Sequence, residues 1–323
     1  MWSELPQLPA PEIDLLPDTI QHPVLVNLSD YRLIVITGPD GEKFLQGQTT
    51  CDFRRLEQHE WLRGAHCNAK GRMHSTFVAA KIDDQQIGLR VHASIAESAL
   101  KALQKYIVFS KAEARVHTAL LVGVLGDAAE ATLPFSLPDV GHCDTGAGFP
   151  VLKLEPNATE IWLLDDAQAG IPDQLPGVWA QPACWQQYFL ERGIAEVTAE
   201  SVEELLPQEL NYQLIDAVSF DKGCYTGQEI VARMHYRAKL KKHLYLAEAD
   251  LSADSTLEFG VDVVGEKGNV GKVINATRLE QNRWRLLALV QDDATQNSAH
   301  LAVAGQPILT WKPLPYAIPN ESS

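Results

Sequence analysis

One segment of the chain, residues 222–229 (KGCYTGQE), carries residue types that could do chemistry. Thr226 and Glu229 have the S/T-x-x-E spacing of a capping box, which predicts that a helix starts with Thr226 at its N-cap. Cys224 would then lie two residues before a helix N-terminus, where negative charge is stabilised, and Lys222 adds a cation nearby. This pattern favours a thiolate at Cys224 or a ligand carboxylate bound by the unpaired amides.

The two glycines of this segment have two possible roles, in ligand binding or in a tight turn. Gly223 and Gly227 would let the backbone turn sharply and approach a ligand closely. Alternatively, Cys224 is a small buried hydrophobic residue, and the glycines serve a tight turn before a helix that packs through Ile230 and Val231. The spacing alone leaves both interpretations open.

A basic stretch follows the segment. Residues 222–243 hold six Lys or Arg and one acid, Glu229, in a chain of 323 residues with a net charge of −15, so the remainder carries −20. Nonspecific binding of nucleic acid through a diffuse basic surface is disfavoured, whereas one positive patch can attract a specific anion, such as a cofactor tail or an RNA backbone. Alternatively, the basic residues bind no anion and are solvated cations near the C-terminus of a helix, where they are favourable. The basic residues after the segment are Arg233, Arg237, Lys239, Lys241 and Lys242.

Composition indicates a folded protein, because 46% of the residues are hydrophobic and 21% are charged. The five cysteines are scattered singly, which suits a reducing compartment. The N-terminus lacks the pattern of a signal peptide, and no apolar run is long enough to span a membrane, so we expect a cytoplasmic protein with no membrane partner. His66, Cys67 and His74 lack the paired spacing of metal ligands, and no metal site is predicted.

Helical and strand patterns alternate irregularly along the chain. Residues 1–22 contain four prolines and are interpreted as an extended arm. From about residue 243 the chain changes to short strand-like runs separated by Gly, Asp and Asn, which predicts a small all-β domain. Between these regions, strands are predicted over 33–37, 119–125 and 160–164, and helices from Pro39, over 94–106, from Pro182 to Gly193 and from Ser201.

The segment KGCYTGQE resembles the signature of the YgfZ family, folate-binding proteins linked to tRNA modification and iron-sulfur enzymes. Three upstream blocks are similar to the family's other blocks, in the same order: ITGPDGEKFLQGQTTCD at 36–52, HCNAKGRMHS at 66–75 and LQKYIVFSK at 103–111. The resemblance covers most of the chain, from about Asp30 to Tyr316.

The resemblance implies the α+β fold of the wider glycine-cleavage T-protein superfamily. In this three-part architecture, two intertwined αβ subdomains surround a folate cavity, and a small β-barrel follows at the C-terminus. We therefore expect an arm over 1–22, a folate-binding region over 23–242 and a barrel over 243–323. T-proteins carry an acidic pair whose aspartate assists one-carbon transfer. Here His74 and Ser75 occupy those places, so the expected acid-base group of an aminomethyltransferase is missing.

The resemblance also implies a ligand, namely folate as tetrahydrofolate or a derivative, including polyglutamylated forms. Two aromatic residues, Tyr31 and Trp185, correspond to family positions that stack on folate rings, although Trp is more typical at the first. Cys224 is the expected functional thiol. The other residues of the segment expected to bind the cofactor are Lys222, Gly223, Tyr225, Gly227, Gln228 and Glu229.

Three functional hypotheses follow. The first is a cytoplasmic folate-binding accessory protein that supports iron-sulfur enzymes, and thereby methylthiolation of some tRNAs, with iron-sulfur enzymes or cluster-assembly proteins as partners. The second is a tetrahydrofolate-dependent one-carbon transferase of the aminomethyltransferase type. The third is an RNA-interaction protein that uses the basic residues of 233–243.

Overall fold

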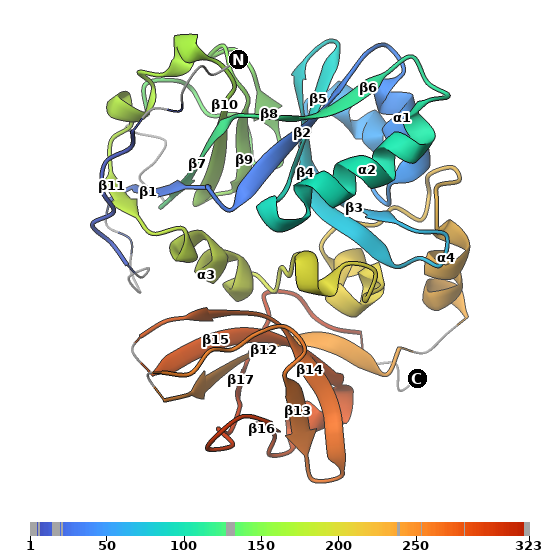
Figure 1. Ribbon diagram of the computed structural model, residues 1–323, viewed down its shortest axis with the longest axis vertical. Helices are drawn as coiled ribbons and strands as arrows, with labels where there is room; N and C mark the ends of the chain where they lie inside the picture. Colours follow the sequence, from blue (N-terminus) through green and yellow to red (C-terminus); the bar gives the residue numbers. More distant parts are fainter. Residues whose placement is uncertain are drawn as a thin grey trace.

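The computed structural model describes residues 5, 7–14, 20, 22–126, 133–237, 240–252, 254–280 and 282–319. The described part is built on three β-sheets (Figure 1). Two of them lie side by side and share a core, and the third, from the C-terminal segment, lies across helix α3 (Ala183–Glu191) from them. No helix of the described part is long and apolar enough to cross a membrane.

The five-stranded sheet is antiparallel, in the order β3-β4-β5-β2-β6. In β2, Leu33 and Val35 face the core shared with the neighbouring sheet, while Ile34 and Ile36 face the core under the helices. Burial on both faces explains why this strand is a continuous apolar run. The elements are β2 (Tyr31–Thr37), α1 (Gly41–Gln48), β3 (Leu62–Cys67), β4 (Met73–Asp83), β5 (Gln86–His92), α2 (Ala96–Ile107) and β6 (Glu113–His117).

The first six-stranded sheet has the order β11-β1-β7-β10-β9-β8. Its strand β1 comes before the five-stranded sheet in the sequence, and its other strands come after it, so the two units are intertwined. Strand β1 pairs parallel to β11 and antiparallel to β7. The strands are β1 (Val24–Asn27), β7 (Leu120–Leu125), β8 (Cys143–Asp144), β9 (Val151–Glu155), β10 (Ala158–Leu163) and β11 (Val178–Ala180).

The third sheet is antiparallel, in the order β16-β13-β14-β15-β12-β17, and has its own apolar core. Its strands are β12 (Lys242–Asp250), β13 (Asp262–Gly265), β14 (Gly268–Arg278), β15 (Arg283–Gln291), β16 (His300–Leu301) and β17 (Thr310–Lys312). Helix α4 (Gln228–Tyr236) precedes it. Short 3₁₀ helices are η1 (Phe53–Gln58), η2 (Ala93–Ile95), η4 (Asp166–Gln168), η5 (Pro172–Gln174), η6 (Ala199–Ser201), η7 (Pro207–Leu210), η8 (Tyr212–Leu214) and η9 (Asp292–Gln296).

Most predicted elements are confirmed. The apolar runs at 119–125 and 160–164 form β7 and β10, and the all-β texture after residue 243 is the third sheet. The helical patterns at 94–106 and 182–193 form α2 and α3. Strand β1 was not predicted, because its four residues are too few to show a period.

The structure differs from the sequence-based expectation at Ser201 and describes only part of the expected N-terminal arm. Ser201 does not begin a helix; it is the last residue of η6, and its hydroxyl accepts a hydrogen bond from the backbone N–H of Thr198, which is the N-cap. The extended arm expected over 1–22 lies partly outside the described residues. Within it, Ile13 forms a parallel bridge with Ala180 at the edge of the six-stranded sheet.

Candidate functional site

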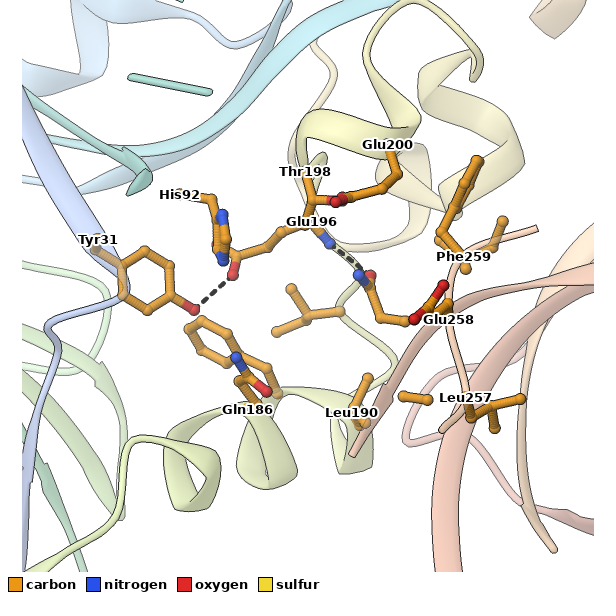
Figure 2. Close-up of a pocket in the computed structure, with 15 residues that line it drawn as sticks. Tyr31, His92, Gln186, Leu190, Glu196, Thr198, Glu200, Leu257, Glu258 and Phe259 are labelled. Atoms are coloured by element: carbon orange, nitrogen blue, oxygen red, sulfur yellow. Dashed lines mark hydrogen bonds between the residues drawn. The ribbon is translucent and has the colours of Figure 1, made fainter. Parts of the chain in front are cut away.

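A cavity of about 390 Å³ lies where α3 and the segment after it meet the third sheet (Figure 2). Its walls come from Tyr31 at the start of β2 and His92 at the end of β5, from seven of the residues between Gln186 and Glu200, and from residues 257–259 and 274–276. Small-molecule sites typically enclose roughly 300–1,000 Å³ and lie at such junctions between structural units. We call this space the central cavity.

The carboxylate of Glu196 is the most firmly held polar group of the central cavity. Its Oε2 accepts a hydrogen bond from the Tyr31 hydroxyl at 2.6 Å, and its Oε1 accepts one from Nη1 of Arg90 at 3.2 Å. The backbone N–H of Glu196 donates to Oδ1 of Asn275 in β14 at 3.0 Å. Glu196 is thus fixed by groups from two different sheets.

A buried arginine, Arg90, holds the carboxylate of Glu196 from the side of the core. Arg90 is fully buried, and its Nε lies 2.9 Å from Oε1 of Glu160, which is also fully buried. Burial opposes the guanidinium charge, but Glu160 and Glu196 reverse that effect and raise the pKa of Arg90. Burial and the nearby Glu196 raise the pKa of the Tyr31 phenol, so Tyr31 remains a hydrogen-bond donor at neutral pH.

The charge of the central cavity is negative. Among its described lining residues are three carboxylates, Glu196, Glu200 and Glu258, and no lysine or arginine. Aromatic rings of Tyr31 and Phe189 lie on the same walls. This combination suits a flat ligand that presents hydrogen-bond donors along one edge.

The structure brings Tyr31 but not Trp185 to the central cavity. Trp185 is fully buried in the core shared by two sheets, and its ring packs over Gly123 of β7, where a Cβ atom would lie 2.5 Å from the indole. One turn later on α3, Phe189 lines the cavity instead. Both residues lie on the apolar face of the helix, so the pattern could not separate them.

The segment 222–229 lies outside the central cavity, since none of its residues lines it. Lys222 is buried, and its Nζ donates to the backbone carbonyls of Thr49 at 2.8 Å and Cys51 at 2.5 Å. Burial lowers the pKa of Lys222 to about 8. Its ammonium also lies over the ring of the buried Tyr225, 5.2 Å from the centroid. Lys222 and Tyr225 therefore anchor the segment to the core.

The blocks at 36–52 and 66–75 converge on this segment. The backbone N–H of Thr226 donates to the carbonyl of Gly47, and its hydroxyl to Oε1 of Gln48, both at 3.2 Å. Gly227 has φ of 85°, and a Cβ atom there would lie 2.5 Å from the carbonyl oxygen of Asn68. Only glycine fits this close approach, which agrees with the tight turn expected before the helix.

The predicted capping box is wrong. Helix α4 begins at Gln228, its N-cap is Gly227 in the left-handed conformation, and no side chain caps it. The Thr226 hydroxyl is engaged by Gln48, and Glu229 pairs with Arg233 one turn later, at 2.6 Å. Gly227, with its positive φ, takes the N-cap position, so Thr226 lies one residue before the N-cap.

Cys224 is exposed, so the interpretation of it as a small buried residue is wrong. The neighbouring Gly223 is also exposed, with open space beside its Cα atom. The other four cysteines are buried, and burial raises the pKa of Cys51 and Cys184 to about 11 and that of Cys67 to about 12. Among the described residues no cluster of three or more His, Cys, Asp or Glu could hold a metal ion.

The basic stretch forms an exposed surface at the end of α4, which we call the α4 surface. The rings of Phe220 and His235 stack with centroids 3.7 Å apart and an interplanar angle of 15°, and Tyr236 meets both edge to face. Tyr236 is 68% exposed and lies beside Arg233 and Arg237 around a shallow depression. Lys239 of the predicted patch lies outside the described residues.

The intertwined αβ units and the third sheet define a known class of fold. The aminomethyltransferase T of the glycine cleavage system from Bartonella henselae superposes with a TM-score of 0.68 at 13% sequence identity, over 91% of this chain and 85% of that chain. The fold is therefore that of the T-proteins, as the resemblance implied.

Sequence comparison identifies the family within this class. The tRNA-modifying protein YgfZ of Aliivibrio fischeri strain MJ11 is 32% identical over 292 residues, covering 87% of this chain and 89% of the relative. That of Escherichia coli O7:K1 strain IAI39 is 33% identical over 307 residues, covering 91% and 93%. The chain belongs to the YgfZ family. No family model matches the chain.

We predict that a single thiol reacts with Ellman's reagent in the native protein and five react after unfolding, because Cys224 is exposed and the other cysteines are buried. The measurement is the absorbance of the released thiolate over time. Cys224→Ser should remove the fast phase, while the matched Cys143→Ser should leave it unchanged. A fast phase of two or more thiols would contradict this assignment.

Proposed function

We propose that this protein is a cytoplasmic folate-binding accessory protein that supports iron-sulfur enzymes, and thereby the modification of tRNA. The observation that carries folate binding is the central cavity with the anchored carboxylate of Glu196. A pterin ring presents an amino group and a ring N–H side by side, and these two donors match the two oxygens of a carboxylate. The relatives are named tRNA-modifying proteins, which supports the link to tRNA.

The walls of the central cavity suit the rest of the pterin. Tyr31 and Phe189 offer ring faces and edges, and Leu190 and Ile194 add apolar surface. Arg90 lies over the Tyr31 ring, 4.2 Å from its centroid, and this contact supports the position of the ring. A flat ligand would meet a preformed wall, which lowers the cost of ordering side chains on binding.

The second hypothesis, aminomethyl transfer, has less support. His74 and Ser75 occupy the places of the acidic pair, and neither lines the central cavity. Nδ1 of His74 lies 3.0 Å from Oε1 of Glu203, and Ser75 is buried. The carboxylate that does face the cavity, Glu196, is already held by Tyr31 and Arg90, which suits binding better than proton transfer.

We predict that Glu196→Gln weakens the binding of tetrahydrofolate by about 10- to 100-fold, because hydrogen bonds to a charged group contribute roughly 1.5–3 kcal/mol. Anaerobic titration calorimetry gives the dissociation constant. Glu97→Gln, at an exposed position of α2, is the matched control and should bind like the wild type. Equal affinities of all three proteins would remove Glu196 from the ligand site.

The accessory role rests on the separation of Cys224 from the central cavity. An exposed thiol on an anchored loop is available to a partner protein, whereas a thiol that served bound folate would line the cavity. The anchoring by Lys222, Tyr225 and Gly227 supports a rigid presentation of Cys224 to that partner.

We predict that Cys224→Ala folds and binds tetrahydrofolate like the wild type but fails to restore a strain that lacks the gene. The readouts are the activity of iron-sulfur enzymes and the level of methylthiolated tRNA. Asp221→Ala, an exposed change three residues earlier, should restore both. Full restoration by Cys224→Ala would show that the thiol is dispensable, and no effect of the gene deletion itself would remove the accessory role.

RNA binding is a second candidate function, favoured by the exposed aromatic and basic side chains of the α4 surface. Tyr236 beside Arg233 and Arg237 offers a ring for base stacking next to cations for phosphates. The other described cations of the stretch are Lys241 and Lys242, at the start of the third sheet.

For this second candidate we predict that Arg233→Glu combined with Arg237→Glu reduces the salt slope of tRNA binding by about 1.4–1.8, as expected for two lost phosphate contacts. Filter binding across a salt series provides the slope. Lys101→Glu with Lys105→Glu, an exposed pair at the same spacing on α2, is the matched control. Undetectable or salt-independent binding by the wild type would exclude the α4 surface as an RNA site.

A further inference from the structure

A second, smaller cavity adjoins the central cavity. It encloses about 270 Å³, and Ile194 lines both cavities. Phe189 lines the central cavity, and its ring centroid lies 5.3 Å from Cζ of Arg63, which lines the second one. Trp61 and Tyr316 complete the aromatic part of its walls. The two cavities therefore lie next to each other and share the side chain of Ile194, just after α3.

Arg63 is a buried cation without a polar partner in the described part of the chain. The residue is 7% exposed, and its guanidinium lies against the rings of Trp61, at 5.6 Å, and Phe189. No described carboxylate or carbonyl accepts a hydrogen bond from it, although a guanidinium has five N–H donors. By contrast, the other described buried arginine, Arg90, contacts two carboxylates.

An unpaired charge is costly at this largely buried position, where the residue reaches open space only in the second cavity. Removing an arginine from water without a counter-ion costs several kcal/mol, and proteins normally pair such a group. Aromatic faces offset only a part of this cost. A ligand anion in the second cavity would supply the missing partner, and a carboxylate matches the planar fork of the guanidinium with two parallel hydrogen bonds.

The two cavities have opposite charge. The central cavity has Glu196, Glu200 and Glu258 in its walls, whereas the second has Arg63 and Arg192 against a single acid, Glu155. Glu155 already pairs with Nε of Arg192, at 3.0 Å, so Arg63 is left for a ligand. A molecule with a donor-rich flat ring at one end and a carboxylate at the other would complement both cavities.

We infer that Arg63 binds a carboxylate of the same ligand whose ring occupies the central cavity, so that the second cavity selects pterins that carry glutamate over pterins that lack it. This inference rests on the proposed folate binding, since folate joins a pterin to glutamate through an aminobenzoyl group. Arg63 would hold the glutamate end, and Glu196 would hold the pterin end.

The test compares two ligands on the full chain by anaerobic calorimetry: tetrahydrofolate, and 6-methyltetrahydropterin, which lacks the aminobenzoylglutamate. Arg63→Met keeps the apolar stem and removes the charge, and it should weaken tetrahydrofolate about 10- to 100-fold while leaving the tetrahydropterin within about twofold. Arg63→Lys should recover part of the loss, because a lysine keeps the charge but not the fork. Arg32→Met, at an exposed position of β2, is the matched control and should change neither affinity.

The melting temperature of the ligand-free protein distinguishes an arginine that binds a ligand from one that only stabilises the fold. Because Arg63→Met removes an unpaired buried charge, its melting temperature without ligand should equal or exceed that of the wild type. Its stabilisation by saturating tetrahydrofolate should be smaller than that of the wild type. A lower melting temperature in the absence of ligand would assign Arg63 to the core and overturn the inference.

The remaining outcomes separate this inference from the proposed function. If Arg63→Met weakens the binding of both ligands equally, or of neither, the proposal of folate binding is retained and the assignment of Arg63 to the glutamate is rejected. If free glutamate binds the wild type, Arg63→Met abolishes that binding and tetrahydrofolate affinity is unchanged, the cavity serves a separate anion, and the inference also falls. If the wild type binds neither pterin, both the proposed function and this inference are overturned.

Discussion

The buried guanidinium of Arg90 joins three parts of this protein through ion pairs in its core. Arg90 belongs to the five-stranded sheet, Glu160 to the six-stranded sheet, and Glu196 to the segment that leads to the third sheet. Since a buried charge without its partners is costly, formation of this triad favours one relative position of the two sheets. The orientation of Glu196, and with it the polar wall of the central cavity, follows from that constraint.

Two separate places on the molecule carry its distinctive chemistry. The central cavity is lined by three carboxylates, whereas the loop with Cys224 is exposed and anchored to the core through Lys222. With the proposed ligand and partner, such a division would let a small molecule and a macromolecule bind one protein without competing for the same groups. It also explains why the residues with the clearest sequence signature are not those that shape the cavity.

Local patterns predicted the helices α2 and α3 and the all-β third sheet, because these elements have apolar periods that do not depend on distant partners. They failed at Thr226, where Gln48, remote in sequence, engages the hydroxyl. Isolated charges such as Arg63 and Glu196 resemble surface residues in the sequence, and only the tertiary fold buries one and anchors the other. Which aromatic residue of α3 reaches the cavity is likewise decided by Gly123 on another strand.

The pairing of β1 has a consequence for synthesis of the chain. Val24 is among the first described residues to leave the ribosome, yet its partners are Leu125 and Val178, so the six-stranded sheet cannot close until more than half of the protein has been made. The five-stranded sheet, whose strands are contiguous in sequence, can form in the meantime. During that interval β1 exposes an apolar edge, which is the condition under which nascent chains aggregate or recruit chaperones. Translation rate is therefore expected to influence the yield of this fold more than that of proteins whose sheets are built from consecutive strands.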